Sequence, residues 1–239
     1  MELNSEAEVS AALSVAELEV VGRMRYSSNA TFLVDARADG VELQAIYKPR
    51  RGERPLWDFP EGTLCHREVA AYELSAALGW GIVPVTILRD GPFGEGAVQQ
   101  FVAHDPDEHF FTLLDGNEDR FRQFAVFDVL ANNTDRKGGH CLHDEADDRI
   151  VGIDHGLTFH PAWKLRTVIW DFAGEMVPEL LRNDVCAAID TVLDGSLRER
   201  LGPHLTAVEL EAIEYRARAL LEQGLPYPDD YRSTPWPLV

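Results

Sequence analysis

Branched hydrophobic residues gather in short stretches over the first hundred positions, a distribution that is typical of strands. Three stretches cover Glu17–Met24, Ala30–Ala38 and Val41–Lys48, and the turn Ala38-Asp39-Gly40 joins the last two. We predict that they pair as an antiparallel sheet. A second hairpin with a glycine-rich turn is predicted from Val85–Arg89 and Ala97–Val102.

One helix is predicted between these sheet segments. Alanine and leucine dominate Leu64–Leu78, Thr63 is a candidate cap, and Gly79 is a stop signal. Beyond the polar run His104–Glu108, helical patterns prevail. The predicted helices are Glu118–Ala131, Glu175–Leu181, Val185–Leu193 and Ala207–Gln223, with small strands near Cys141 and Ile150.

The change of pattern along the chain predicts an α+β protein of two lobes. Residues 1–103 form a sheet-rich lobe with one long helix, and residues 104–239 form a mainly helical lobe. A chain of 239 residues is long enough for two closely packed lobes. The proline-rich end, Pro226–Pro237, is predicted to be an extended strap or a frayed tail.

Acidic side chains outnumber basic ones by 41 to 22, so the formal net charge is -19 at pH 7. This charge repels the phosphates of nucleic acids and anionic membranes, and we expect neither as a partner. Cys65, Cys141 and Cys186 form no paired motif, which indicates a reducing cytoplasm. No run approaches the roughly 18 apolar residues of a membrane span, so no integral membrane association is expected.

Two carboxylates beside turn signals carry the candidate chemistry. Asp135 lies in the polar run from Asn132 to His140, and Asp154 follows the apolar residues Ile150 to Ile153. An unpaired carboxylate among apolar residues is costly, so Asp154 is expected to have a metal, cation or amide partner.

The remaining parts of a phosphotransferase site lie in the first half of the chain. Phosphoryl transfer also needs a lysine on the phosphates and a carboxylate that holds it, and Lys48 and Glu68 are candidates for these roles. The loop Arg25–Asn29 offers the hydroxyls of Ser27 and Ser28 to a phosphate.

The order of short motifs resembles the phosphatidylinositol 3/4-kinase-related group, with the type II phosphatidylinositol 4-kinase branch closest and HipA and the secreted Fam20 kinases more distant. A small bacterial branch is suspected. The resemblance covers roughly residues 20 to 160. It rests on the segments Tyr47-Lys48-Pro49, His66-Arg67-Glu68-Val69-Ala70-Ala71-Tyr72, Val83-Pro84, Gln100-Phe101-Val102, Asn133-Thr134-Asp135-Arg136 and Ile153-Asp154-His155-Gly156-Leu157.

This resemblance implies a protein-kinase-like fold with ATP in a cleft between two lobes. Lys48 would contact the phosphates and Glu68 would pair with Lys48. Asp135 would be the catalytic aspartate, Asp154 the principal Mg²⁺ ligand, and Arg136 a cation near the transferred phosphoryl group. The residues beside the adenine would be Gln100, Phe101 and Val102.

One departure from the family concerns the metal. The family usually has an asparagine, as a second metal ligand, five positions after the catalytic aspartate, where this chain has His140. Imidazole is a softer donor than a carboxamide, so either one Mg²⁺ suffices or Mn²⁺ is used. The same substitution leaves open an ATP-binding pseudokinase with a regulatory role. A nucleotidyl transferase is also open.

The acceptor is open among a protein Ser/Thr hydroxyl, a small polyol and a lipid, with lipid last because of the acidic charge. The segment His160–Glu175, with Lys164, Arg166 and Trp170, is the expected acceptor surface. A metal-dependent hydrolase is the competing class of enzyme, because imidazole and carboxylate together bind zinc or iron. Its candidate ligands are His140, His143, His155, His160 and Asp154.

Overall fold

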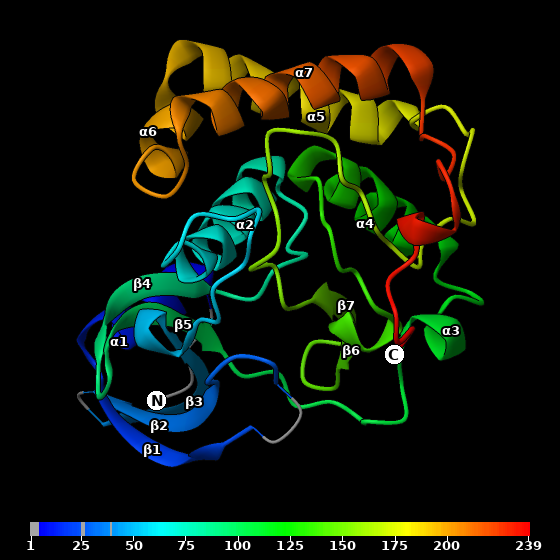
Figure 1. The fold of residues 1–239 in the computed structure, drawn as a ribbon. Helices are drawn as coiled ribbons and strands as arrows, with labels where there is room; N and C mark the ends of the chain where they lie inside the picture. The colour runs from blue at the N-terminus through cyan, green and yellow to red at the C-terminus, as the bar shows by residue number, and fades with distance from the viewer. Residues whose placement is uncertain (1–4, 25–26, 39) are drawn as a thin grey trace.

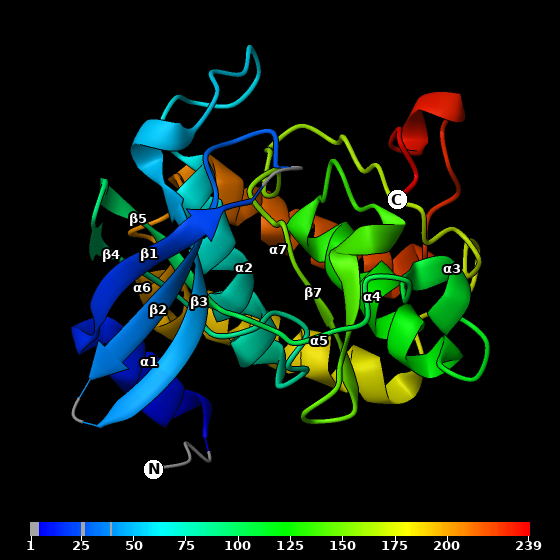
Figure 2. The same cartoon turned by 90° about the horizontal axis from the view of Figure 1, so that it is seen from below.

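The computed structural model describes residues 5–24, 27–38 and 40–239, so the predictions for Arg25, Tyr26 and Asp39 fall outside it. Five strands form one antiparallel sheet in the order β1-β2-β3-β5-β4 (Figure 2). Their bounds are β1 Glu17–Arg23, β2 Phe32–Ala38, β3 Val41–Pro49, β4 Thr86–Gly91 and β5 Gly94–Gln100.

The two faces of this sheet have different partners because side chains alternate along a strand. On one face, Ala45 and Tyr47 of β3 are buried against helix α1, Glu6–Val15. Lys48, between Tyr47 and Pro49, belongs to the opposite face. Helix α2, Leu64–Leu78, covers part of that face through Val69, which packs on Ala97 of β5. Lys48 therefore lies on the side of the sheet that faces α2 and the rest of the molecule.

The second half of the chain is mainly helical. Figure 1 shows α5 and α7 lying across α2 and α4, so α2 packs between the sheet and the later helices. The bounds are α3 Phe110–Leu113, α4 Glu118–Ala131, β6 Cys141–Asp144, β7 Arg149–Gly152, α5 Glu179–Asp194, α6 Ser196–Leu201 and α7 Ala207–Gln223, with short 3-10 turns η1 Arg50–Gly52, η2 Gly138–His140 and η3 Tyr231–Ser233.

The α+β class and the order of a sheet-rich half before a helical half are confirmed. The predicted bounds of α2, α4 and α7 are also confirmed. Two predicted helices, Glu175–Leu181 and Val185–Leu193, were wrong as separate elements: they are the single helix α5, which begins only at Glu179. Arg182, Asn183 and Asp184 carry no glycine or proline that would break the helix.

The predicted strap at the C-terminal end packs back on the helical half. Ser233 accepts hydrogen bonds at its backbone oxygen from the backbone of Thr167 (3.0 Å) and the indole of Trp170 (3.2 Å). Leu238 accepts one from the backbone of Gly138 (2.6 Å). No helix in the described part of the chain has both the length and the apolar character needed to cross a bilayer.

Candidate functional site

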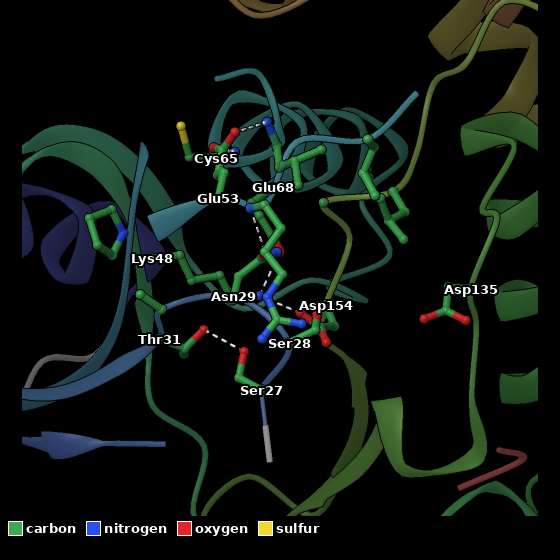
Figure 3. Close-up of a pocket in the computed structure, with 17 residues that line it drawn as sticks. Ser27, Ser28, Asn29, Thr31, Lys48, Glu53, Cys65, Glu68, Asp135 and Asp154 are labelled. Carbon is green, nitrogen blue, oxygen red and sulfur yellow. Dashed lines mark hydrogen bonds and ion pairs between the residues drawn. The ribbon is translucent and has the colours of Figure 1, made fainter. Parts of the chain in front are cut away.

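Lys48 forms the centre of a group of charged side chains that come from three separate segments (Figure 3). Its Nζ lies 2.5 Å from Glu68 Oε1 of α2 and 2.8 Å from Asp154 Oδ1, just after β7. Burial alone would lower the pKa of Lys48, but the charges of Asp154 and Glu68 outweigh it and raise that pKa. Lys48 is therefore a permanent cation, held between two carboxylates.

Glu68 is fixed on both sides. Its Oε2 accepts a hydrogen bond from the backbone N–H of His155 (3.0 Å), so helix α2 contacts the segment that carries Asp154. Burial raises the pKa of Glu68 and the charge of Lys48 opposes that rise.

The start of α2 differs from the prediction. Thr63 makes no side-chain cap, because its hydroxyl donates to the backbone oxygen of Pro60 (2.7 Å). Glu53 takes that place and accepts from the backbone N–H groups of Leu64 (3.1 Å) and Cys65 (2.8 Å). A carboxylate on free N–H groups at a helix start is favourable because of the helix dipole. The helix that carries Glu68 is thus anchored by the charged loop that follows Lys48.

Asp154 has a left-handed backbone with φ of 63°, which costs a non-glycine residue about 1–3 kcal/mol and is concentrated at functional sites. Its side chain is 54% exposed at the rim of the cleft. The charge of Lys48 lowers the pKa of Asp154, so the carboxylate is ionised at neutral pH. A strained, ionised and accessible carboxylate is suited to bind a metal ion.

His140, the predicted second metal ligand, lies beside Asp154. Its Nε2 is 3.5 Å from Asp154 Oδ2, and burial lowers the pKa of His140 to about 4, so the imidazole is neutral. No group of three His, Cys, Asp or Glu side chains that could hold a metal occurs in the part of the chain that the structure describes. Two protein donors fit Mg²⁺ or Mn²⁺ when phosphate oxygens and water complete the shell.

Asp135 stands across the cavity from Lys48, Glu68 and Asp154 (Figure 3). Its backbone N–H donates to the side-chain oxygen of Asn133 (3.0 Å), and its carboxylate lies 3.3 Å from the Nζ of Lys137. Burial raises the pKa of Asp135, with Lys137 opposing. Its carboxylate lines the same cavity as the other three side chains.

The predicted role of Arg136, a cation near the transferred phosphoryl group, requires a correction. Its side chain is fully buried, forms an ion pair with Asp128 (2.9 Å), and donates to the backbone oxygen of Ile153 (3.1 Å). A guanidinium that is enclosed in this way does not face the cleft, so it cannot contact a transferred phosphoryl group as predicted. Arg136 instead ties the segment of Asp135 to the segment of Asp154.

Asp128 of α4 is the partner that the sequence analysis missed. It also accepts hydrogen bonds from Asn133 Nδ2 (3.0 Å) and Thr167 Oγ1 (3.3 Å), and it has no exposed surface. Charged groups are buried only when they are paired. The signal was present, because Asp128 is the one acid within the apolar run Phe124–Ala131.

Arg67 is a second missed residue. Its guanidinium donates to the backbone oxygen of Thr158 (2.7 Å) and forms a buried ion pair with Glu209 of α7 (2.5 Å). Arg67 precedes Ala70, Ala71 and Leu74 at helical spacing, and all four are buried, so the apolar stripe of α2 contained the signal. Helix α2 is thereby fixed to the helical half directly next to Glu68.

Two adjoining cavities lie beside the sheet, and Lys48 lines both of them. One, of about 270 Å³, is lined by Ser27, Ser28 and the four charged side chains. The other, of about 240 Å³, is lined by Lys48, Asp154 and the predicted adenine residues Gln100, Phe101 and Val102. Both lie in the cleft between the sheet and the helical half.

The backbone distinguishes among the three predicted adenine residues. The N–H groups of Gln100 and Phe101 donate to the backbone oxygens of Val85 (2.8 Å) and Gln44 (3.0 Å). Within the described residues, the N–H of Val102 has no backbone partner. Val102 is therefore the one residue of the three that has a backbone donor to offer.

The histidines proposed as metal ligands of a metal-dependent hydrolase do not lie together around Asp154. His143 pairs with Glu108 and Asp148, each at 2.9 Å. His155 is fully buried, and its ring lies 2.7 Å from an Nη of Arg136. His160 packs its ring against Phe59. Of this set, His140 alone approaches the Asp154 carboxylate among the described residues.

The sheet lobe with Lys48 and Glu68, and the helical lobe with Asp135 and Asp154, define a protein of kinase-like fold. A solved structure of the Helicobacter pylori proinflammatory kinase CtkA superposes with a TM-score of 0.54, covering 86% of this chain and 92% of that one at 13% identity. This likeness concerns the fold.

The chain belongs to the same family as Protein Rv2133c of Mycobacterium tuberculosis (strain ATCC 25618 / H37Rv). The two are 41% identical, over 95% of this chain and 94% of that protein. No family model matches the chain.

Proposed function

We propose that the protein is an ATP-dependent phosphotransferase that moves the γ-phosphoryl group of ATP to a hydroxyl acceptor. The observation that carries the proposal is the contact of Lys48 with both Glu68 and Asp154, in a cleft whose other wall holds Asp135. Phosphoryl transfer needs a cation on the phosphates, a carboxylate that holds this cation, a metal-binding carboxylate and an acceptor-binding carboxylate. The four side chains supply one of each.

In this proposal the nucleotide lies along the two cavities. Its adenine takes the apolar one and receives a hydrogen bond from the N–H of Val102. Its phosphates lie at Lys48 and beside the hydroxyls of Ser27 and Ser28. Asp154 and His140 would hold Mg²⁺ or Mn²⁺, which would supply positive charge for the phosphate oxygens.

Asp135 orients the acceptor. Its carboxylate accepts a hydrogen bond from the acceptor hydroxyl, whose oxygen forms a bond to the γ-phosphorus. The bond from this phosphorus to the bridging oxygen breaks, and ADP leaves with the electron pair. The hydroxyl proton passes to Asp135 and then to water. Because burial raises the pKa of Asp135, its carboxylate is a stronger base than an exposed aspartate.

Label transfer from ATP tests the proposal. With γ-labelled ATP and Mn²⁺, label is expected on an acceptor from a set of serine and threonine peptides and small polyols. Asp135→Asn is expected to reduce the rate about 10²- to 10⁴-fold, the usual contribution of a general base. Asp119→Asn on α4, where the side chain is fully exposed, is the matched control and should keep the activity. Transfer of α-label alone would identify a nucleotidyl transferase and refute the proposal.

A second candidate is a pseudokinase that binds ATP and regulates a partner. The observation that favours it is His140, a neutral imidazole at the place of the expected second oxygen ligand. It predicts that ATP raises the melting temperature, that Lys48→Ala abolishes this rise, and that no label is transferred with either metal. Measurable transfer that Asp135→Asn abolishes would exclude it.

Closer assignment to the type II phosphatidylinositol 4-kinase branch stays a prediction. So do the cytoplasmic location and the absence of nucleic-acid partners. A lipid acceptor is the least favoured of the three classes because the net charge of -19 opposes approach to an anionic surface.

A further inference from the structure

We infer that the acceptor carries an anionic group, a phosphate or a carboxylate, and that Arg166 binds it. This inference rests on the proposed function. The site is a groove of about 700 Å³ that Asp135 lines and Lys48 does not. We call it the acceptor groove. It is lined by Leu56, Trp57, Asp58, Phe59, Thr134, Asp135, Leu157, Trp163, Lys164, Leu165, Arg166, Asp229, Asp230, Arg232 and Ser233.

Asp135 lines both this groove and the cavity that holds Lys48, whereas Arg166 lines the groove only. A hydroxyl at Asp135 would therefore have the nucleotide on one side and Arg166 on the other. This arrangement assigns Arg166 to the acceptor rather than to the phosphates of ATP.

Backbone hydrogen bonds to the segment that carries Asp135 set the position of Arg166. Its backbone N–H donates to the oxygen of Asn133 (2.8 Å), and its oxygen accepts from the N–H of Arg136 (3.0 Å). These two partners flank Asp135 in the sequence. The side chain is oriented as well, because its Nε donates to the backbone oxygen of Arg232 (2.9 Å). The two terminal nitrogens of the guanidinium remain for a ligand.

The cations that line the groove differ in whether a carboxylate neutralises them. Lys164 lies 2.7 Å from Asp58, so this pair cancels. The Asp230 carboxylate accepts from the backbone N–H of Arg232 (2.7 Å), and Asp229 is exposed. Within the resolved segments of the chain, neither Arg166 nor Arg232 has a carboxylate within ion-pair distance.

An anion is the ligand that such a pair of arginines would bind. The guanidinium is a planar fork that matches the oxygens of a phosphate or a carboxylate. The groove is also lined by four aspartates, Asp58, Asp135, Asp229 and Asp230, so an anion would be held by the arginines themselves and not by an overall positive charge. A small acceptor fits the volume, which lies within the roughly 300–1,000 Å³ of small-molecule sites.

Two tryptophans make the inference measurable. Trp57 is 92% exposed, and Trp163 is 43% exposed, and both line the acceptor groove. Binding in the groove is therefore expected to change the intrinsic fluorescence. The probes are glycerol 3-phosphate, glycerate and glycerol, which share hydroxyl groups and differ in carrying a phosphate, a carboxylate or no charge.

At least one of the two charged probes is expected to bind about tenfold more tightly than glycerol, and their ranking distinguishes a phosphate site from a carboxylate site. Arg166→Gln should weaken binding of that probe about tenfold, or 1.4 kcal/mol, and leave glycerol unchanged. Arg166→Lys should be intermediate because the charge stays and the fork is lost. Arg198→Gln on α6 removes an exposed arginine outside the groove and is the control.

The inference is overturned if glycerol binds as tightly as both charged probes, or if Arg166→Gln and Arg198→Gln behave alike. Titration of the same variants with Mn²⁺ and a non-hydrolysable ATP analogue separates the two proposals. Arg166→Gln should bind the analogue like the unmodified protein. A protein that prefers the anionic probes but binds no nucleotide would retain the anion site and lose the proposed kinase activity.

Discussion

The buried ion pair between Arg67 and Glu209 gives a prediction with a defined magnitude. The change is Glu209→Gln on α7. Glutamine keeps the shape but has a single acceptor oxygen, whereas Glu209 accepts from Arg67 with one oxygen and from Thr206 with the other. With that oxygen turned to Arg67, the substitution removes the charge and the side-chain contact with the Thr206 N–H in the capping box. Arg67, whose side chain is 2% exposed, is left as a buried cation without its carboxylate.

Removal of one partner from a buried ion pair costs about 3–5 kcal/mol. Because glutamine still accepts one hydrogen bond from Arg67, we expect the lower end, about 3 kcal/mol of unfolding free energy. For a chain of this size, 1 kcal/mol corresponds to about 2–4 °C, so the melting temperature should fall by about 6–12 °C. The loss also loosens α2 beside Glu68.

Urea unfolding at neutral pH measures this loss, with Glu214→Gln as the control on the same helix. Glu214 pairs with Arg218, whose side chain is 58% exposed, and such a pair contributes at most about 0.5 kcal/mol. The reasoning fails if the two variants lose the same stability.

The same pair sets a pH dependence. Burial would raise the pKa of Glu209, but hydrogen bonds from Thr206 and Arg67 outweigh it and lower that pKa. The carboxylate therefore stabilises the fold fully above its unfolded pKa of about 4.3, and this contribution is lost as the pH falls through the lower folded-state pKa. The gap in unfolding free energy between the unmodified protein and Glu209→Gln should thus be constant near neutral pH and shrink in acid.

Two further predictions concern the site. His140→Asn replaces nitrogen by oxygen beside Asp154 and should raise the ratio of transfer rates with Mg²⁺ over Mn²⁺; an unchanged ratio would place His140 outside the metal shell. Asp128→Asn leaves Arg136 buried without its carboxylate and should cost about 3–5 kcal/mol in urea unfolding. A cost below 1 kcal/mol would mean that Arg136 finds another partner.

Much of the fold was predictable because its signals are local. The bounds of α4 and α7 follow from hydrophobic spacing and from stop signals next to each helix. The set of Lys48, Glu68 and Asp154 was predictable from the order of motifs, although the contacts between them span up to 106 positions.

The direction of individual side chains was not predictable. Arg136 follows Asp135 directly, and adjacency in the sequence does not reveal that its guanidinium points to Asp128 in the core. The cap of α2 comes from Glu53, eleven residues before Leu64, rather than from Thr63. Each of these side-chain contacts depends on which distant segments lie next to each other in the folded chain. The pattern of a single sequence does not reveal those neighbours.

The central claim is that Lys48 and Asp154 converge on a metal-bound nucleotide, and calorimetric titration with Mn²⁺ and a non-hydrolysable ATP analogue tests it most directly. We expect saturable binding to one site. Lys48→Met should weaken it at least tenfold, about 1.4 kcal/mol, and Asp154→Asn should remove its dependence on metal. Absence of binding, or equal affinity in the unmodified protein and both variants, would contradict the claim.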